Sequence, residues 1–133
     1  KMKDELENKL VKEFPNLYKQ TSLSPQETCM CWGFCCGDGW EKIIYNLSKK
    51  ITELDPNVEA VQVKEKFGGL RFYIGPVIQD KADEVYDAIS EAESESFKTC
   101  EYCGTKENVT TKGPGWIKTL CNDCRKERSK KIE

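Results

Sequence analysis

Four cysteines near the C-terminal end have the type and spacing of metal ligands. Cys100 and Cys103 form one C-x2-C pair, and after a spacer of 17 residues Cys121 and Cys124 form a second. This spacing is typical of a four-thiolate zinc site. Because protein atoms fill all four positions, no position is left for water or substrate, so we predict one structural zinc ion. Two redox disulfides are the less favoured alternative, because no thioredoxin-like βαβ pattern surrounds the pairs.

A second group of cysteines has a different spacing. Cys29, Cys31, Cys35 and Cys36 form C-x-C and C-C steps, which fit a tetrahedral cage poorly. We expect them to be small buried hydrophobes, with a second zinc ion as the less favoured alternative. The chain has no histidine, and so it lacks the usual general base near neutral pH. This favours a binding module over an enzyme.

Residues 58–75 predict a β-hairpin with Gly68-Gly69 as its two-residue turn. Pairing Phe67 with Leu70 would place Lys66 opposite Arg71 and Lys64 opposite Tyr73. The two faces would then be Val61, Val63, Glu65, Phe67, Leu70, Phe72 and Ile74 on one side, and Gln62, Lys64, Lys66, Arg71 and Tyr73 on the other. The second face combines cations with an aromatic ring, which suits phosphate binding and base stacking. An ordinary solvated face is the competing interpretation.

The predicted ligand-binding set comprises Lys64, Lys66, Arg71 and Tyr73 together with Trp32, Asp38 and Trp40. Asp38 is also expected to cap the helix that follows, with Glu41 three residues later as in a capping box. Aromatic side chains near cysteines more often build a core than a ligand platform. Glu65 is a misfit on the apolar face of the hairpin, and needs a cationic or hydrogen-bonding partner there. It therefore either anchors the fold or marks a site.

Helical periodicity predicts the remaining elements. Residues 2–18 predict a first amphipathic helix that ends or kinks near Pro15. A second predicted helix runs to Leu54, and residues 79–97 predict a third helix with an acidic outer face. We predict an α+β fold, with three helices packed on a β-hairpin or small antiparallel sheet. A treble-clef-like zinc module follows. The domains are residues 1–98, with the order helix, Cys-rich loop, helix, hairpin, helix, and residues 99–133, the zinc module with a basic C-terminal helix.

Composition limits the location and the partners. The 133 residues contain no apolar run that could span a membrane and no signal-peptide pattern, and 33% are charged, so we expect a cytoplasmic protein that has no membrane partner. Residues 80–97 carry seven acids, whereas residues 118–133 carry six Lys or Arg against three acids. The net charge of −2 disfavours broad coating of DNA.

Residues 28–124 resemble a family of small, largely uncharacterised proteins encoded by phages and prophages. The resemblance is carried by Cys31-Trp32-Gly33-Phe34, by Cys36-Gly37-Asp38-Gly39-Trp40, by the hairpin phrase from Val61 to Tyr73, and by the two cysteine pairs with Gly115-Trp116-Ile117. It implies a phage accessory protein in an infected bacterial host. Such proteins often bind host or defence components, so a counter-defence role follows from the resemblance.

Three functions follow from these observations. The first is a non-catalytic, zinc-stabilised binding protein whose basic hairpin face contacts a nucleotide signal or a nucleic acid. The second is a protein–protein adaptor or inhibitor of a host protein, in which the acidic third helix resembles a polyanion. The third is a metal-dependent nuclease that uses Asp38, Glu41 or Glu65, although no paired-carboxylate motif supports it. A homo-oligomer is compatible with each.

Overall fold

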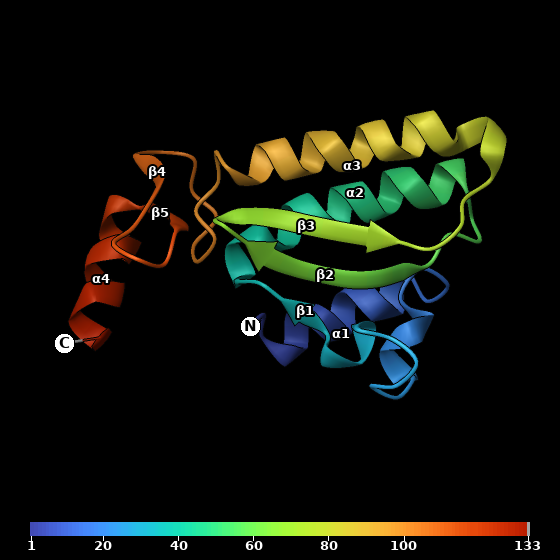
Figure 1. Cartoon of the computed structure of the whole chain (residues 1–133), viewed down its shortest axis with the longest axis horizontal. Helices are drawn as coiled ribbons and strands as arrows, with labels where there is room; N and C mark the ends of the chain where they lie inside the picture. The colour runs from blue at the N-terminus through green and yellow to red at the C-terminus, as the bar shows by residue number, and fades with distance from the viewer. Residues whose placement is uncertain (133) are drawn as a thin grey trace.

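The structure is a computed structural model that describes residues 1–132. Glu133, the last residue of the predicted zinc module, lies outside the described residues. Figure 1 shows a larger α+β part and a smaller C-terminal part beside one end of its sheet. The predicted fold class is confirmed: helices cover small sheets, and a cluster of four cysteines that fits a zinc module lies in the C-terminal part.

A three-stranded sheet forms the centre of the larger part. Its strands are β1 (Phe34–Cys35), β2 (Ala60–Lys66) and β3 (Gly69–Ile74), in the order β1-β2-β3. The β2 and β3 strands form the predicted antiparallel hairpin, whereas β1 is parallel to β2. The sequence led us to expect a loop at β1, since a two-residue strand is too short to show alternation.

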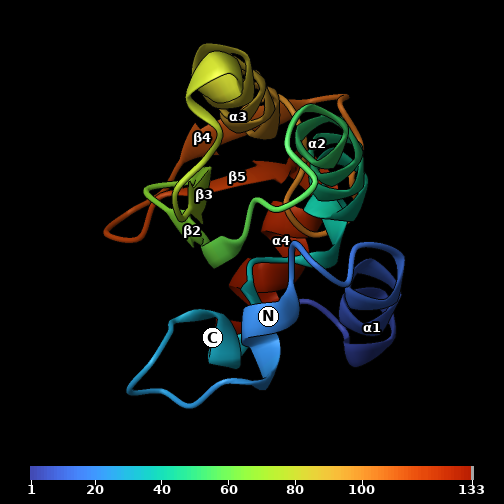
Figure 2. The ribbon, with the colours of Figure 1, turned by 90° about the vertical axis from the view of Figure 1, so that its right-hand side faces the viewer.

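Helices cover this sheet as the apolar stripes predicted. They are α1 (Asp4–Glu13), α2 (Glu41–Leu54) and α3 (Ala82–Ser96), joined by short 3-10 turns η1 (Lys19–Ser22), η2 (Met30–Trp32), η3 (Asp38–Trp40) and η4 (Gln79–Lys81). Figures 1 and 2 show α2 and α3 side by side over one face of the hairpin, with α1 on the far side of β1. None of the helices in the described range is long and apolar enough to cross a bilayer.

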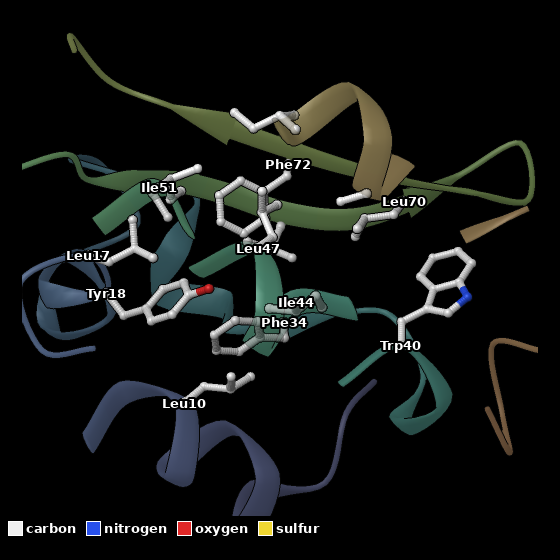
Figure 3. Packing of buried hydrophobic residues seen from close by; sticks show 14 of the residues in the cluster. Leu10, Leu17, Tyr18, Phe34, Trp40, Ile44, Leu47, Ile51, Leu70 and Phe72 are labelled. Carbon is white, nitrogen blue, oxygen red and sulfur yellow. The ribbon is translucent and has the colours of Figure 1, made fainter. Parts of the chain in front are cut away.

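The core lies between α2, α3 and the sheet and continues towards α1. Figure 3 shows Phe34 and Ile44 at its centre, with Leu10 of α1 below them and Phe72 of β3 above. These side chains are almost fully buried. Tyr18 is also buried, and its hydroxyl shares a hydrogen bond with Ser48 Oγ, so its polar atom is satisfied inside the core.

The C-terminal part consists of the short hairpin β4 (Val109–Lys112) and β5 (Lys118–Cys121), followed by α4 (Asn122–Ile132). The helix α4 corresponds to the predicted basic C-terminal helix. Arg125 ties α4 to the hairpin, because its guanidinium donates hydrogen bonds to the carbonyl oxygens of Thr110 and Lys112 at 2.6 and 3.0 Å. This part has its own small buried cluster of Cys100, Leu120 and Cys121.

The predicted register of the β2–β3 hairpin is wrong by two residues. The turn is Phe67-Gly68, and Lys64 lies opposite Arg71 while Glu65 lies opposite Leu70. Gly69 is instead a strand residue opposite Lys66, and the position needs glycine because a Cβ there would collide with the Phe97 ring. A shift of two residues keeps the strand side chains from Gln62 to Ile74 on their predicted faces, since side chains alternate with a period of two. The prediction is wrong for Val61, because a bulge between Ala60 and Gln62 places it in one hollow with Gln62 and Lys64. The basic face therefore survives with different cross-strand neighbours.

The predicted capping box at the start of α2 is also wrong. The Asp38 carboxylate makes no capping hydrogen bond, and its Oδ1 accepts one at 2.8 Å from the backbone N–H of Lys3. Glu41 pairs with Lys9 at 3.8 Å. Both acids therefore hold the N-terminal segment against the start of α2, a long-range role that local spacing did not indicate.

Candidate functional site

The C-terminal cysteines converge on one point. The Sγ atoms of Cys100, Cys103, Cys121 and Cys124 all lie within 4.8 Å of one another, and none forms a disulfide. The Cys103 and Cys121 Sγ atoms are 3.8 Å apart. A tetrahedron with metal–sulfur bonds of about 2.3 Å has edges of about 3.8 Å, so the cluster has the dimensions of a four-thiolate metal site. The four cysteines could hold a metal ion, as their spacing predicted.

Three local elements position these thiols. Cys100 and Cys103 flank a tight turn that Gly104 completes at a φ of 83°, where its N–H donates to the Cys100 carbonyl at 2.9 Å. Cys121 is the last residue of β5, and Cys124 lies in the first turn of α4. The Cys100–Cys103 turn, which we call the knuckle, contributes two cysteines, and the β4–β5 hairpin and the start of α4 contribute one each. This is the predicted treble-clef-like arrangement.

The environment lowers the pKa of one ligand thiol. Burial raises the pKa of Cys100, but hydrogen bonds from the backbone N–H groups of Cys103, Cys121 and Tyr102 outweigh it and lower that pKa to about 7. Metal ligation needs thiolates, and backbone N–H groups aimed at sulfur stabilise them. In contrast, burial and the neighbouring thiols raise the pKa of Cys124, so without a cation this thiol keeps its proton.

The Gly37-Asp38-Gly39-Trp40 turn docks onto the Cys100–Cys103 knuckle. The Gly39 N–H donates to the Glu101 carbonyl at 2.7 Å, and the Gly37 N–H donates to the Glu101 carboxylate at 2.9 Å. A Cβ at Gly39 would collide with the Cys100 carbonyl oxygen, so glycine is required for this close approach. The turn is thus part of the interface between the core and the metal centre.

This docking changes the roles of Asp38 and Trp40 among the predicted ligand-binding residues. Trp40 is fully buried, and its indole N–H donates to the Thr99 carbonyl at 2.9 Å. It is a core residue with no surface for a ligand (Figure 3). The Asp38 carboxylate accepts a hydrogen bond from the Lys3 backbone N–H and forms an ion pair with the Lys3 ammonium. Both residues stabilise the fold.

Glu65 anchors the fold, the first of the two roles that the sequence left open for it. Its Oε1 lies 3.1 Å from Lys118 Nζ, and its Oε2 accepts a hydrogen bond from the Gly68 N–H at 2.8 Å. Lys118 also pairs with Glu101 at 3.2 Å, and all three side chains are at most 15% exposed. This buried triad joins the β2–β3 turn to the metal knuckle. Lys118 and Glu101 were not identified from the sequence. The only signal for them was that Glu65, an acid on an apolar face, needs a partner.

The outer face of the β2–β3 hairpin brings together four of the five remaining candidates. Lys64 and Arg71 are directly opposite each other, Tyr73 follows on β3, and Lys66 lies next to the turn. Tyr73 and Lys66 are exposed, and Lys64 and Arg71 are half-buried. Lys64 and Tyr73 line a hollow of about 440 Å³ between the hairpin and the segment after η1. Within residues 1–132, none of these three cations has a carboxylate within 4.0 Å.

Trp32 lies apart from this face. It is 61% exposed and lines another hollow together with Glu7 and Met30. The cysteines beside it have mixed environments: Cys36 is buried in the core, as predicted, whereas Cys29 and Cys35 are exposed, so the prediction of buried thiols is wrong for these two. Burial raises the pKa of the Cys36 thiol. In the described part of the chain, only the C-terminal cysteines form a group of three or more potential metal ligands.

The three carboxylates considered for a nuclease are each engaged separately. Asp38 pairs with Lys3, Glu41 with Lys9, and Glu65 with Lys118. A two-metal site requires acids that share one cation position. Glu65 and Glu101 do converge, but on the Lys118 ammonium, and among the described residues no group of three or more carboxylates lies close enough to hold a metal ion. These residues therefore give the nuclease interpretation no geometric support.

Comparison of the chain with protein-family models, with curated proteins and with solved structures gave no match.

Proposed function

We propose that this chain is a zinc-stabilised, non-catalytic binding protein whose outer hairpin face contacts a phosphate-bearing ligand. The supporting observation is the pair of half-buried cations at Lys64 and Arg71, which lie directly opposite each other without a carboxylate partner in the described residues. Like charges at opposed strand positions destabilise a sheet. An anionic ligand between Lys64 and Arg71 would attract both side chains and so offset the repulsion between them.

The surroundings favour a phosphate group attached to an aromatic base. Tyr73 offers an exposed ring next to the cations, and Gln62 lines the same hollow with an amide group that suits the edge of a base. The amide of Gln20, which also lines the hollow, is already hydrogen-bonded to Glu59 and Thr28, and Glu27 is the one acid in the lining. Arg71 carries a planar guanidinium that can bind two phosphate oxygens at once. A nucleotide fits these features in size and chemistry.

Zinc is the metal proposed for the cysteine cluster. Four thiolates at tetrahedral spacing suit Zn²⁺, and the filled coordination shell assigns the ion a structural role. When bound, the ion would hold the knuckle, β5 and α4 together. The phage accessory and counter-defence setting is part of the same proposal and rests on the resemblance of the motifs alone.

Native mass spectrometry of protein purified from its natural host tests the proposal, because it reports the zinc number, the subunit count and any retained nucleotide. The matched variants are Lys64→Gln with Arg71→Gln, and a control with Lys12→Gln and Lys49→Gln, which removes the same charge from exposed sites on α1 and α2. We expect the first pair to lose the ligand and the control to keep it. Equal ligand retention by both pairs would reject the hairpin face as the site.

A protein partner is the second candidate, and the exposed acids of α3 favour it. Asp83, Asp87 and Glu91 all face away from the core and have no lysine or arginine within 4.0 Å among the residues described. A host protein that binds polyanions could dock on this helix. Capture of a protein that survives nuclease treatment and is abolished by Asp83→Asn with Asp87→Asn would support this alternative.

A further inference from the structure

Two exposed aromatic side chains lie at the tips of neighbouring hairpins. Phe67 is in the β2–β3 turn and is 64% exposed, and Trp116 is in the β4–β5 connection and is 71% exposed. Both line one hollow of about 410 Å³, together with Ile117 and Lys66. We call Phe67, Trp116 and Ile117 the aromatic patch. Figure 1 shows the β2–β3 turn directed at the C-terminal part, and the shared hollow places the two tips beside each other.

The relative position of the two tips is fixed by buried polar contacts. Thr119 Oγ1 donates a hydrogen bond to the Gly68 carbonyl at 2.6 Å, and Lys118 joins Glu65 from the same strand. A Cβ at Gly68 would lie only 2.9 Å from Thr111 Cγ2, so the turn is in close contact with β4 and β5. The aromatic patch is therefore a preformed surface that spans both parts of the molecule.

The residue types in the patch are unfavourable for stability alone. Phe67 adopts a φ of 54°, a conformation in which hairpin turns strongly prefer asparagine or glycine. Trp116 is 71% exposed, so its large ring contributes little to the buried core. Large aromatic side chains in such positions indicate a surface that is covered by a ligand.

Cations border the patch on both sides. Lys66 Nζ lies 5.6 Å from the centre of the Phe67 ring. Beyond Trp116, a second hollow of about 630 Å³ is lined by Lys112, Arg125 and Arg128, and its lining includes no carboxylate. The hollow between Phe67 and Trp116 has one acid in its lining, Glu65, and the charge of Glu65 is balanced by Lys118. The surface thus presents exposed rings between unopposed positive charges.

We propose that the aromatic patch binds single-stranded nucleic acid, with bases stacked on Phe67 and Trp116 and phosphates beside Lys66, Lys112 and Arg128. Alternating rings and cations match the alternating bases and phosphates of a single strand, whereas a duplex keeps its bases stacked on one another. This inference rests on the proposed function, since Lys66 joins the patch to the outer hairpin face. It identifies the phosphate-bearing ligand as a polymer.

The test uses the full zinc-loaded chain and fluorescence anisotropy of labelled oligothymidine and oligouridine of about 16 nucleotides, which is as long as the site of a large single-strand-binding fold. Trp116→Ala and Phe67→Asn should each weaken binding about 5-fold to 150-fold, the range expected when one stacked base is lost. Trp32→Ala is the matched control, because its indole has similar exposure in a distant hollow. Quenching of tryptophan fluorescence should be lost in Trp116→Ala alone, and zinc content should stay unchanged throughout.

Several outcomes separate this inference from the proposed function. Binding of a nucleotide that depends on Lys64 and Arg71, without binding of either oligonucleotide, overturns the inference and leaves the proposed function standing. Equal affinity for duplex, or for oligoglutamate, overturns it as well, because neither ligand offers an unstacked base. Binding of no nucleotide and no oligonucleotide refutes both. A preference between the two oligonucleotides, lost in Trp116→Ala, supports the inference and identifies DNA or RNA as the natural strand.

Discussion

Replacing Lys118 with methionine tests the idea that a buried charge triad couples the hairpin to the metal centre. Lys118 Nζ is 3.1 Å from Glu65 Oε1 and 3.2 Å from Glu101 Oε1. Methionine keeps most of the side-chain volume but removes the charge. Lys118→Met would leave two buried carboxylates facing each other without a cation.

The expected loss can be worked out from these contacts. Breaking a buried pair by removing one partner costs about 3 to 5 kcal/mol. Each carboxylate keeps a backbone donor, the Gly68 N–H for Glu65 and the Gly37 N–H for Glu101, and Lys118 is 15% exposed. We therefore expect the lower end, a decrease of about 3 kcal/mol in the free energy of unfolding. Single domains are stable by only about 5 to 15 kcal/mol, so such a decrease is easily measured.

Urea unfolding of the zinc-loaded protein, followed by circular dichroism, measures this difference. Lys106→Met is the matched control: Lys106 pairs with Glu95 in an exposed position, and such surface pairs contribute only about 0 to 1 kcal/mol. Adding Glu65→Gln to Lys118→Met should recover part of the loss, because one of the two uncompensated charges disappears. If Lys118→Met changes the free energy of unfolding by no more than Lys106→Met does, the triad does not couple the two parts.

Three other perturbations have clear expected results. Cys124→Ser, or a strong chelator, should unfold β4, β5 and α4, whereas α2 and α3 should keep their protection from hydrogen exchange. The reason is that the two parts have separate buried clusters. A uniform loss of protection would contradict this. Gly39→Ala should lower the melting temperature by several degrees, since its Cβ would collide with the Cys100 carbonyl; an unchanged melting temperature would show that the knuckle can move. Phe67→Asn should stabilise the protein by about 1 kcal/mol, because asparagine tolerates the positive φ better; destabilisation in thermal unfolding would show that the ring packs usefully.

Local patterns were sufficient to predict the cysteine cluster and most of the secondary structure, although not the two-residue strand β1. Cysteine pairs with short internal gaps can converge wherever the chain returns, so their spacing identified the four cysteines that could hold a metal ion. The apolar stripe of α2 and the alternation along β2 and β3 reflect periods of 3.6 and 2, which each segment carries by itself. The same period of two preserved the basic face although the predicted register was wrong.

Only the tertiary structure decided the contacts between distant segments. Phe97, at the end of α3, lies against Gly69 and leaves no room for a side chain there. The environments of Trp40 and Asp38 depend on the metal knuckle and on the N-terminal segment. Glu65 gains its cation from Lys118, which is 53 residues away along the chain. Such partners are set by packing across the whole molecule, and no local spacing encodes them. The sequence by itself therefore determined which cysteines could hold a metal ion and which face of the hairpin is basic, and packing decided which of the remaining candidates stayed on the surface.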